Sequence, residues 1–210
     1  MGSDGAASDG RYTTLLVDYG GVLTSSPFLS FQSFCETEGL EPDAVIGRFR
    51  DDACRQLIVG LETGELSEEA FEPRFAEFLG VSAPQLIDRL FAAYQPDAEM
   101  QSAVLQARQS GIRTGLISNS WGTRRYDHSR LGELFDGVVI SGEVGMRKPS
   151  PEIYELGAER AGAAPQECVF VDDLAWNLEP AAELGMATVH HTDTQRTIGE
   201  LEQLFGVQLR

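Results

Sequence analysis

One carboxylate, Asp18, ends an apolar run and is followed almost at once by two glycines. The run, residues 15–17, consists of strand-forming side chains and predicts a buried strand. Gly20 and Gly21 then predict a tight turn, because glycine tolerates backbone angles that other residues avoid. Asp18 would therefore lie at the carboxyl end of a strand, which is where open α/β sheets bind ligands. Aspartate also begins turns for purely local reasons, so this segment alone leaves both interpretations open.

Three further polar clusters lie at or beside the ends of predicted strands. They are Ser118-Asn119, Lys148 at the entrance to a predicted helix, and Asp172-Asp173. Each has an ordinary alternative, because serine, asparagine and aspartate also cap helices and a lysine before proline is often a surface residue. Adjacent acids repel each other, however, and usually need a cation. The combination of all these clusters favours a functional site.

The charge of the chain limits its partners. The 210 residues carry a formal net charge of −17, which argues against nucleic acid or an anionic membrane as a partner. A phosphate would have to be held locally by a metal ion, a few placed cations and backbone N–H groups. The three cysteines show no metal-finger spacing and predict reduced thiols in a cytoplasmic protein. The sequence contains no apolar run of membrane-spanning length, and residues 1–10 lack the apolar core of a signal peptide.

Strand-like and helix-like segments alternate over most of the chain. This alternation predicts βαβ units, hence an α/β fold with a Rossmann-like, doubly wound parallel sheet. The predicted strands are Tyr12–Val17, Ile112–Ser118, Gly137–Ser141, Cys168–Val171 and Ala187–His190. The predicted helices are Ala98–Gln109, Thr123–Leu131, Pro151–Ala161, Ala175–Leu184 and Gln195–Leu204.

Residues 28–95 break the alternation, because their pattern is helical throughout and rich in phenylalanine. The interval is too long for an ordinary connection and predicts an inserted helical cap above the carboxyl edge of the sheet. We expect its aromatic side chains to pack within that cap, and Ser67 to begin one of its helices. The predicted domains are a disordered segment at 1–10, a core at 11–27 and 96–210, and the cap at 28–95.

The order of these motifs resembles that of the haloacid dehalogenase-like hydrolase superfamily, from Tyr12 to about Leu204. The matching motifs are an apolar strand ending in Asp18, a second ending in Ser118-Asn119, the run Gly-Met-Arg-Lys-Pro around Lys148, and a strand ending in two aspartates. The helical insertion resembles the type I cap. The branch that looks most similar includes the phosphatase domain of bifunctional epoxide hydrolases and sugar-phosphate phosphatases.

The resemblance implies a catalytic carboxylate and a Mg²⁺ site. Asp18 would be the nucleophile that attacks phosphorus, and its carboxylate would also bind Mg²⁺. The backbone carbonyl of Gly20 and the carboxylate of Asp173 would be further ligands, and Asp172 would support Asp173 or reach the metal through water. Such an oxygen-only site suits Mg²⁺.

The resemblance also implies where the phosphate would lie. The Ser118 side chain and the Asn119 backbone would hydrogen-bond it, and Lys148 would neutralise charge on the nucleophile and the transferring group. The implied function is a Mg²⁺-dependent phosphomonoesterase acting on a small phosphorylated metabolite, with the cap closing over the substrate. A homodimer is compatible with this architecture.

One position departs from the pattern of the family. Its phosphatases usually carry a second aspartate two residues after the nucleophile, where this chain has Gly20. General acid–base catalysis typically contributes about 10²- to 10⁴-fold, so another group would have to donate the proton. Glu62, Glu65, a metal-bound water and a substrate hydroxyl are the candidates. Two alternatives stay open: a weakly active or inert relative that binds a phosphorylated ligand or a protein partner, and a metal-free 2-haloacid dehalogenase.

Overall fold

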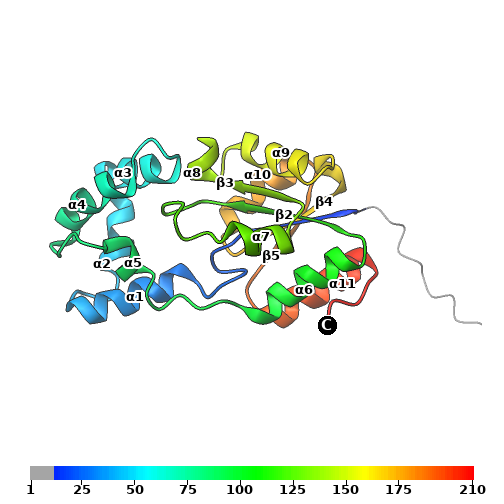
Figure 1. Ribbon diagram of the computed structural model, residues 1–210, viewed down its shortest axis with the longest axis horizontal. Coiled ribbons are helices and arrows are strands. Elements are labelled where there is room, and N and C mark those ends of the chain that lie inside the picture. The colour runs from blue at the N-terminus through cyan, green and yellow to red at the C-terminus, as the bar shows by residue number, and fades with distance from the viewer. Residues whose placement is uncertain (1–11) are drawn as a thin grey trace, which may run out of the picture.

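The computed structural model describes residues 12–210 (Figure 1). The expected disorder of residues 1–10 lies outside this range. Over the described residues, no helix has both the length and the apolar character needed to span a membrane.

The core is a five-stranded parallel sheet with the order β3-β2-β1-β4-β5. Its strands are β1 Thr14–Val17, β2 Arg113–Ser118, β3 Gly137–Ile140, β4 Cys168–Asp172 and β5 Ala187–His190. All five strands were predicted, because each is a short apolar run bounded by polar or glycine residues. The strand order reverses direction beside β1, so the carboxyl ends of β1, β2 and β4 meet at one edge.

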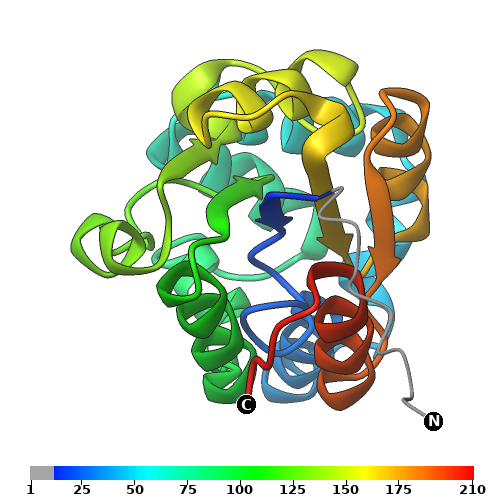
Figure 2. The ribbon, with the colours of Figure 1, turned by 90° about the vertical axis from the view of Figure 1, so that its right-hand side faces the viewer.

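Helices cover both faces of the sheet, as Figure 2 shows. Side chains alternate along a strand, so Leu15 and Val17 face one layer and Leu16 faces the other. The first layer contains α6 Ala98–Gln109, α7 His128–Leu134 and α11 Thr194–Phe205, and the second contains α9 Pro151–Arg160 and α10 Ala175–Glu183. The predicted α/β, doubly wound architecture is therefore confirmed.

A helical insertion lies between β1 and β2 and forms a lobe beside the sheet (Figure 1). It consists of α1 Pro27–Glu38, α2 Ala44–Gly47, a 3₁₀ turn at Arg48–Arg50, α3 Asp52–Glu62, α4 Glu68–Leu79 and α5 Leu86–Leu90. Its phenylalanines pack into one apolar cluster, as expected. Ser67 caps α4, because its hydroxyl accepts a hydrogen bond from the Ala70 amide at 3.3 Å.

The predicted helix Thr123–Leu131 is wrong at its start. The helix there, α7, begins only at His128, because the Asp127 carboxylate accepts the amides of Ser129 and Arg130 and so caps it. Residues 123–127 therefore remain in a loop that faces the cap. Two short elements were not predicted, α8 Ser141–Val144 and a 3₁₀ turn at Pro165–Glu167.

Candidate active site

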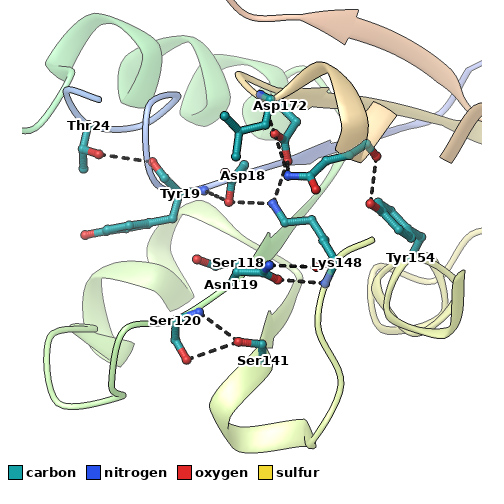
Figure 3. Close-up of polar contacts among 12 residues, drawn as sticks. Asp18, Tyr19, Thr24, Ser118, Asn119, Ser120, Ser141, Lys148, Tyr154 and Asp172 are labelled. Carbon is teal, nitrogen blue, oxygen red and sulfur yellow. Dashed lines mark hydrogen bonds and ion pairs between the residues drawn. The ribbon is translucent and has the colours of Figure 1, made fainter. Parts of the chain in front are cut away.

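The polar clusters of the sequence meet at the carboxyl edge of the sheet (Figure 3). Asp18 directly follows β1, Ser118 ends β2 and Asp172 ends β4. Val17 is in register with Leu116 and Val171, so the three polar positions lie at similar heights in neighbouring strands. The parallel topology alone therefore brings together residues that are far apart in the chain.

Lys148 is the centre of this cluster and the only lysine in the sequence. Its Nζ lies 2.8 Å from Asp18 Oδ1 and 2.7 Å from Asp172 Oδ2, and its side chain is 1% exposed. Burial alone would lower the pKa of Lys148, but Asp172 and Asp18 together raise it above its ordinary value. The lysine is therefore charged at neutral pH and is shared by two carboxylates.

The Asn119 side chain holds the lysine in place. Asn119 Oδ1 accepts the Lys148 amide at 2.8 Å, and Asn119 Nδ2 donates to the Lys148 carbonyl at 3.0 Å. Both polar atoms of the Asn119 side-chain amide therefore bond the backbone of Lys148, which lies in a different loop. No helix begins at Ser118-Asn119, so the helix-cap alternative for this pair is excluded.

Asp172 and Asp173 are adjacent but have different surroundings. Asp172 is fully buried, and besides Lys148 it accepts the Leu174 amide at 2.8 Å and Asn177 Nδ2 at 3.0 and 3.1 Å. Asp173 is only half-buried and faces the turn after β1. A Cβ atom at Gly21 would fall 2.2 Å from Asp173 Oδ2, and Gly21 has a φ of +78°. Glycine is thus required there both for the backbone angle and for the approach of this carboxylate.

The donor set fits a divalent cation. Carboxylate oxygens of Asp18, Asp172 and Asp173 all lie within 4.8 Å of one another, and Lys148 forms ion pairs with the first two. Burial raises the pKa of Asp18, an effect that Lys148 opposes and the other two acids increase. Burial and Asp172 also raise the pKa of Asp173, to about 6. This excess of negative charge among oxygen ligands is the environment that Mg²⁺ prefers.

Ser118 points toward the same edge but also has a partner that sequence patterns did not reveal. Its hydroxyl lies 2.8 Å from the hydroxyl of Tyr126, whose ring packs against Tyr19 with centroids 5.1 Å apart. Tyr126 is in the loop before α7, which was predicted as helix. A correct placement of the Asp127 cap would have identified this loop as part of the site.

A cavity of about 390 Å³ lies between the cap and the carboxyl edge. Its polar floor includes Asp18, Asn119, Lys148 and Asp173. Its remaining lining is mostly apolar and comes largely from the cap: Pro27, Phe28, Phe31, Ile46, Phe49, Ile58, Val59, Phe91, Trp121 and Trp176. Trp121 belongs to the core but packs into the aromatic cluster of the cap, 5.3 Å from the ring of Phe31. The cap thus covers the site with apolar side chains.

Two acids of the cap connect it to the core. Glu62 lines the cavity, and its Oε2 lies 2.6 Å from Arg147 Nε. Glu68 accepts the amide of Thr123 at 3.2 Å and Arg124 Nε at 2.7 Å. Glu65, the other candidate proton donor of the cap, is exposed and does not line the cavity.

Comparison with protein families supports a common origin for this arrangement. The family model described as haloacid dehalogenase-like hydrolase matches residues 12–185. The chain is 32% identical over 167 residues to bifunctional epoxide hydrolase 2 of Sus scrofa, covering 70% of this chain and 30% of that protein. It is 35% identical over 118 residues to the sesquiterpene phosphatase astK of Aspergillus oryzae, covering 53% of this chain and 59% of that protein. The chain thus spans less than two thirds of either relative.

A solved structure shows the same fold. The HAD family enzyme of Bacteroides thetaiotaomicron, in complex with magnesium and inorganic phosphate, superimposes with a TM-score of 0.64 at 25% identity. The match covers 85% of this chain and 93% of that enzyme.

Proposed function

We propose that this chain, which belongs to the haloacid dehalogenase-like hydrolase family, is a Mg²⁺-dependent phosphomonoesterase acting on a small phosphorylated metabolite. The observation that carries the proposal is the buried contact of Asp18 with Lys148, beside two further carboxylates and beneath a cavity. The phosphate-containing complex of the Bacteroides enzyme supports the same assignment.

The reaction has two halves, both centred on Asp18. An oxygen of the Asp18 carboxylate attacks phosphorus, the ester bond breaks, and an aspartyl-phosphate forms. The Ser118 hydroxyl and the backbone N–H of Asn119 hydrogen-bond the phosphoryl oxygens, while Lys148 balances the charge on the nucleophile. Water then attacks phosphorus, inorganic phosphate leaves, and the Asp18 carboxylate is restored.

The residues that would hold Mg²⁺ are Asp18, the Gly20 carbonyl and Asp173, with Asp172 as a third acid beside them. When bound, the ion would neutralise charge on the phosphoryl group. Asp172 uses its oxygens on Lys148, Asn177 and the Leu174 amide, so we assign it mainly to positioning the lysine. Three carboxylates beside one lysine support a metal–phosphate site over metal-free attack on a haloacid carbon.

The lining of the cavity supports a substrate whose alcohol is apolar. Aromatic and aliphatic side chains of the cap surround the space above the floor. A sugar would leave its hydroxyl groups without partners against such a surface, whereas an alkyl or isoprenyl chain would bury apolar area there. The relative named as a sesquiterpene phosphatase supports this preference.

The test is phosphate release from p-nitrophenyl phosphate, farnesyl phosphate, n-octyl phosphate and glucose 6-phosphate, with Mg²⁺ or with EDTA. We expect turnover that requires Mg²⁺ and falls at least about 10³-fold in Asp18→Asn. The matched control is Asp43→Asn, because Asp43 is exposed and its side chain caps nothing.

The order of the substrates tests the apolar preference. Each buried CH₂ group contributes about 0.8 kcal/mol, which is roughly fourfold in kcat/KM. We therefore expect kcat/KM for octyl phosphate and farnesyl phosphate to exceed kcat/KM for glucose 6-phosphate by at least about tenfold. Absence of turnover on all four, from a folded protein that phosphate stabilises, would contradict the enzymatic proposal and favour an inert ligand-binding relative.

A further inference from the structure

The space beside Gly20 is occupied by a hydroxyl group from another part of the chain. A Cβ atom built on Gly20 would lie 2.6 Å from Tyr94 Oη and 3.1 Å from Pro27 Cγ. Gly20 itself lines the cavity next to Asp18. The hydroxyl therefore lies where a side chain two residues after the nucleophile would begin.

The segment that carries Tyr94 is fixed at the junction of cap and core. The Ser25 amide donates to the Gln95 carbonyl at 2.7 Å, and the Gln95 amide donates to Ser25 Oγ at 3.0 Å. The Tyr94 ring packs edge-on against Phe91 with centroids 5.3 Å apart, and its hydroxyl is hydrogen-bonded with Thr24. The phenol is thus held in one place by the two linkers that connect the cap.

We propose that Tyr94 is the proton donor that replaces the carboxylate missing at Gly20, an inference that rests on the proposed phosphatase function. As Asp18 attacks phosphorus, the electron pair of the breaking P–O bond moves to the ester oxygen, which takes the proton of Tyr94 Oη and leaves as the alcohol. The resulting phenolate then takes a proton from the water that attacks the aspartyl-phosphate. Tyr94 and Asp18 both return to their starting states, so protons and electrons balance.

The other side chains that could donate the proton are less suitable. Glu62 is in an ion pair with Arg147, and Glu65 is exposed outside the cavity. The Tyr126 hydroxyl lies 2.8 Å from that of Ser118, which we assign to the phosphoryl group, whereas the Tyr94 hydroxyl lies beside Gly20. Burial raises the pKa of Tyr94, so the phenol is protonated at neutral pH, and a departing alkoxide is a stronger base than a phenolate and takes this proton.

The experiment compares Tyr94→Phe with the wild-type enzyme on n-octyl phosphate and p-nitrophenyl phosphate. An alkoxide needs a proton to leave, whereas p-nitrophenolate leaves without one. We expect kcat on octyl phosphate to fall about 10²-fold and kcat on p-nitrophenyl phosphate to fall less than about threefold. An equal loss on both substrates, or no loss on either, would overturn the proposal.

Tyr12→Phe is the matched control, because Tyr12 stands before the amino end of β1 and packs against the sheet rather than the site. Turnover of p-nitrophenyl phosphate by the wild type, and its loss in Asp18→Asn, tests the phosphatase function separately. Failure of the Tyr94 proposal is thereby distinguished from failure of the proposed function.

A second variant tests the same geometry without altering Tyr94. The backbone of Gly20 is outside the left-handed region, so Gly20→Ala causes no backbone strain, and its methyl group meets the Tyr94 hydroxyl and, less closely, Pro27 Cγ. We expect its methyl group to displace that hydroxyl and to cause the same selective loss on octyl phosphate. Both changes remove the same proton donor. The double variant Gly20→Ala, Tyr94→Phe should therefore lose no more kcat on octyl phosphate than either single variant. Multiplicative losses in the double variant would refute the assignment.

Discussion

Replacement of Lys148 by methionine tests whether the buried cation holds the site together. The substitution retains most of the apolar stem and removes the charge that lies 2.8 Å from Asp18 and 2.7 Å from Asp172. Two buried carboxylates would then face each other without a partner cation. Breaking a buried ion pair in this way costs about 3–5 kcal/mol, because an uncompensated charge remains.

Protonation limits that cost and makes it depend on pH. Protonating an aspartate costs about 1.4 kcal/mol for each pH unit above its ordinary pKa of about 3.9. The loss of unfolding free energy therefore cannot exceed about 5 kcal/mol at pH 7.5 or about 2 kcal/mol at pH 5.5. In the variant the folded state binds more protons than the unfolded state, so its stability falls as pH rises. Lys148 of the wild type stays charged at both pH values, because its pKa is raised.

The assay is urea denaturation of wild type and Lys148→Met at both pH values, in EDTA so that no metal replaces the lost charge. We expect a loss in unfolding free energy of about 3–5 kcal/mol at pH 7.5 that shrinks to about 2 kcal/mol or less at pH 5.5. The control is Arg196→Met, which removes an exposed cation from a surface pair with Glu200 and should cost less than about 1 kcal/mol. A loss below about 1 kcal/mol at pH 7.5, or one that does not shrink at pH 5.5, would refute the reasoning.

Three further predictions follow from the packing. Glu68→Ala should lower the unfolding free energy by about 1–3 kcal/mol in urea denaturation, because the backbone amides of Thr123 and Arg124 lose their acceptor. An unchanged denaturation midpoint would contradict this. All three cysteines are buried, and burial raises the pKa of Cys54 to about 11 and that of Cys168 to about 12. A thiol reagent should therefore leave the native protein unmodified and modify all three cysteines in denaturant; fast native reaction would contradict this. Gly137→Ala should cost about 1–3 kcal/mol by thermal melting, because its Cβ would lie 2.5 Å from backbone of the helix end packed on β3; a neutral effect would show that the helix end shifts freely.

The sheet and most of its helices could be predicted because their signals are local. β1 was expected at Tyr12–Val17 and spans Thr14–Val17, since an apolar run that precedes a glycine turn has few alternatives. The start of α7 could not be placed in this way. The pattern of residues 123–131 is compatible with a helix, but the Asp127 cap and the contact of the preceding loop with Glu68 keep residues 123–127 out of the helix.

The site could be predicted only as far as topology brings strand ends together. Asp18, Ser118 and Asp172 end parallel strands, so their proximity follows once the sheet is assumed. The contact of Tyr94 with Gly20 and that of Glu62 with Arg147 depend instead on how the cap lies on the core, for which the sequence has no periodic signal. The recognition of a haloacid dehalogenase-like hydrolase is confirmed, whereas the roles of individual site residues stay predictions.

The ion pairs of the cavity also bear on how so acidic a chain could bind a phosphate. Among the described residues that line the cavity, each cation already has a carboxylate partner: Lys148 has two aspartates, Arg147 has Glu62, and Arg55 has Asp52. None of these side chains therefore offers an unbalanced positive charge to an arriving phosphate, and the net charge of −17 repels it. A divalent cation at Asp18 and Asp173 would supply the missing charge, which is why Mg²⁺ should be needed for phosphate binding as well as for turnover.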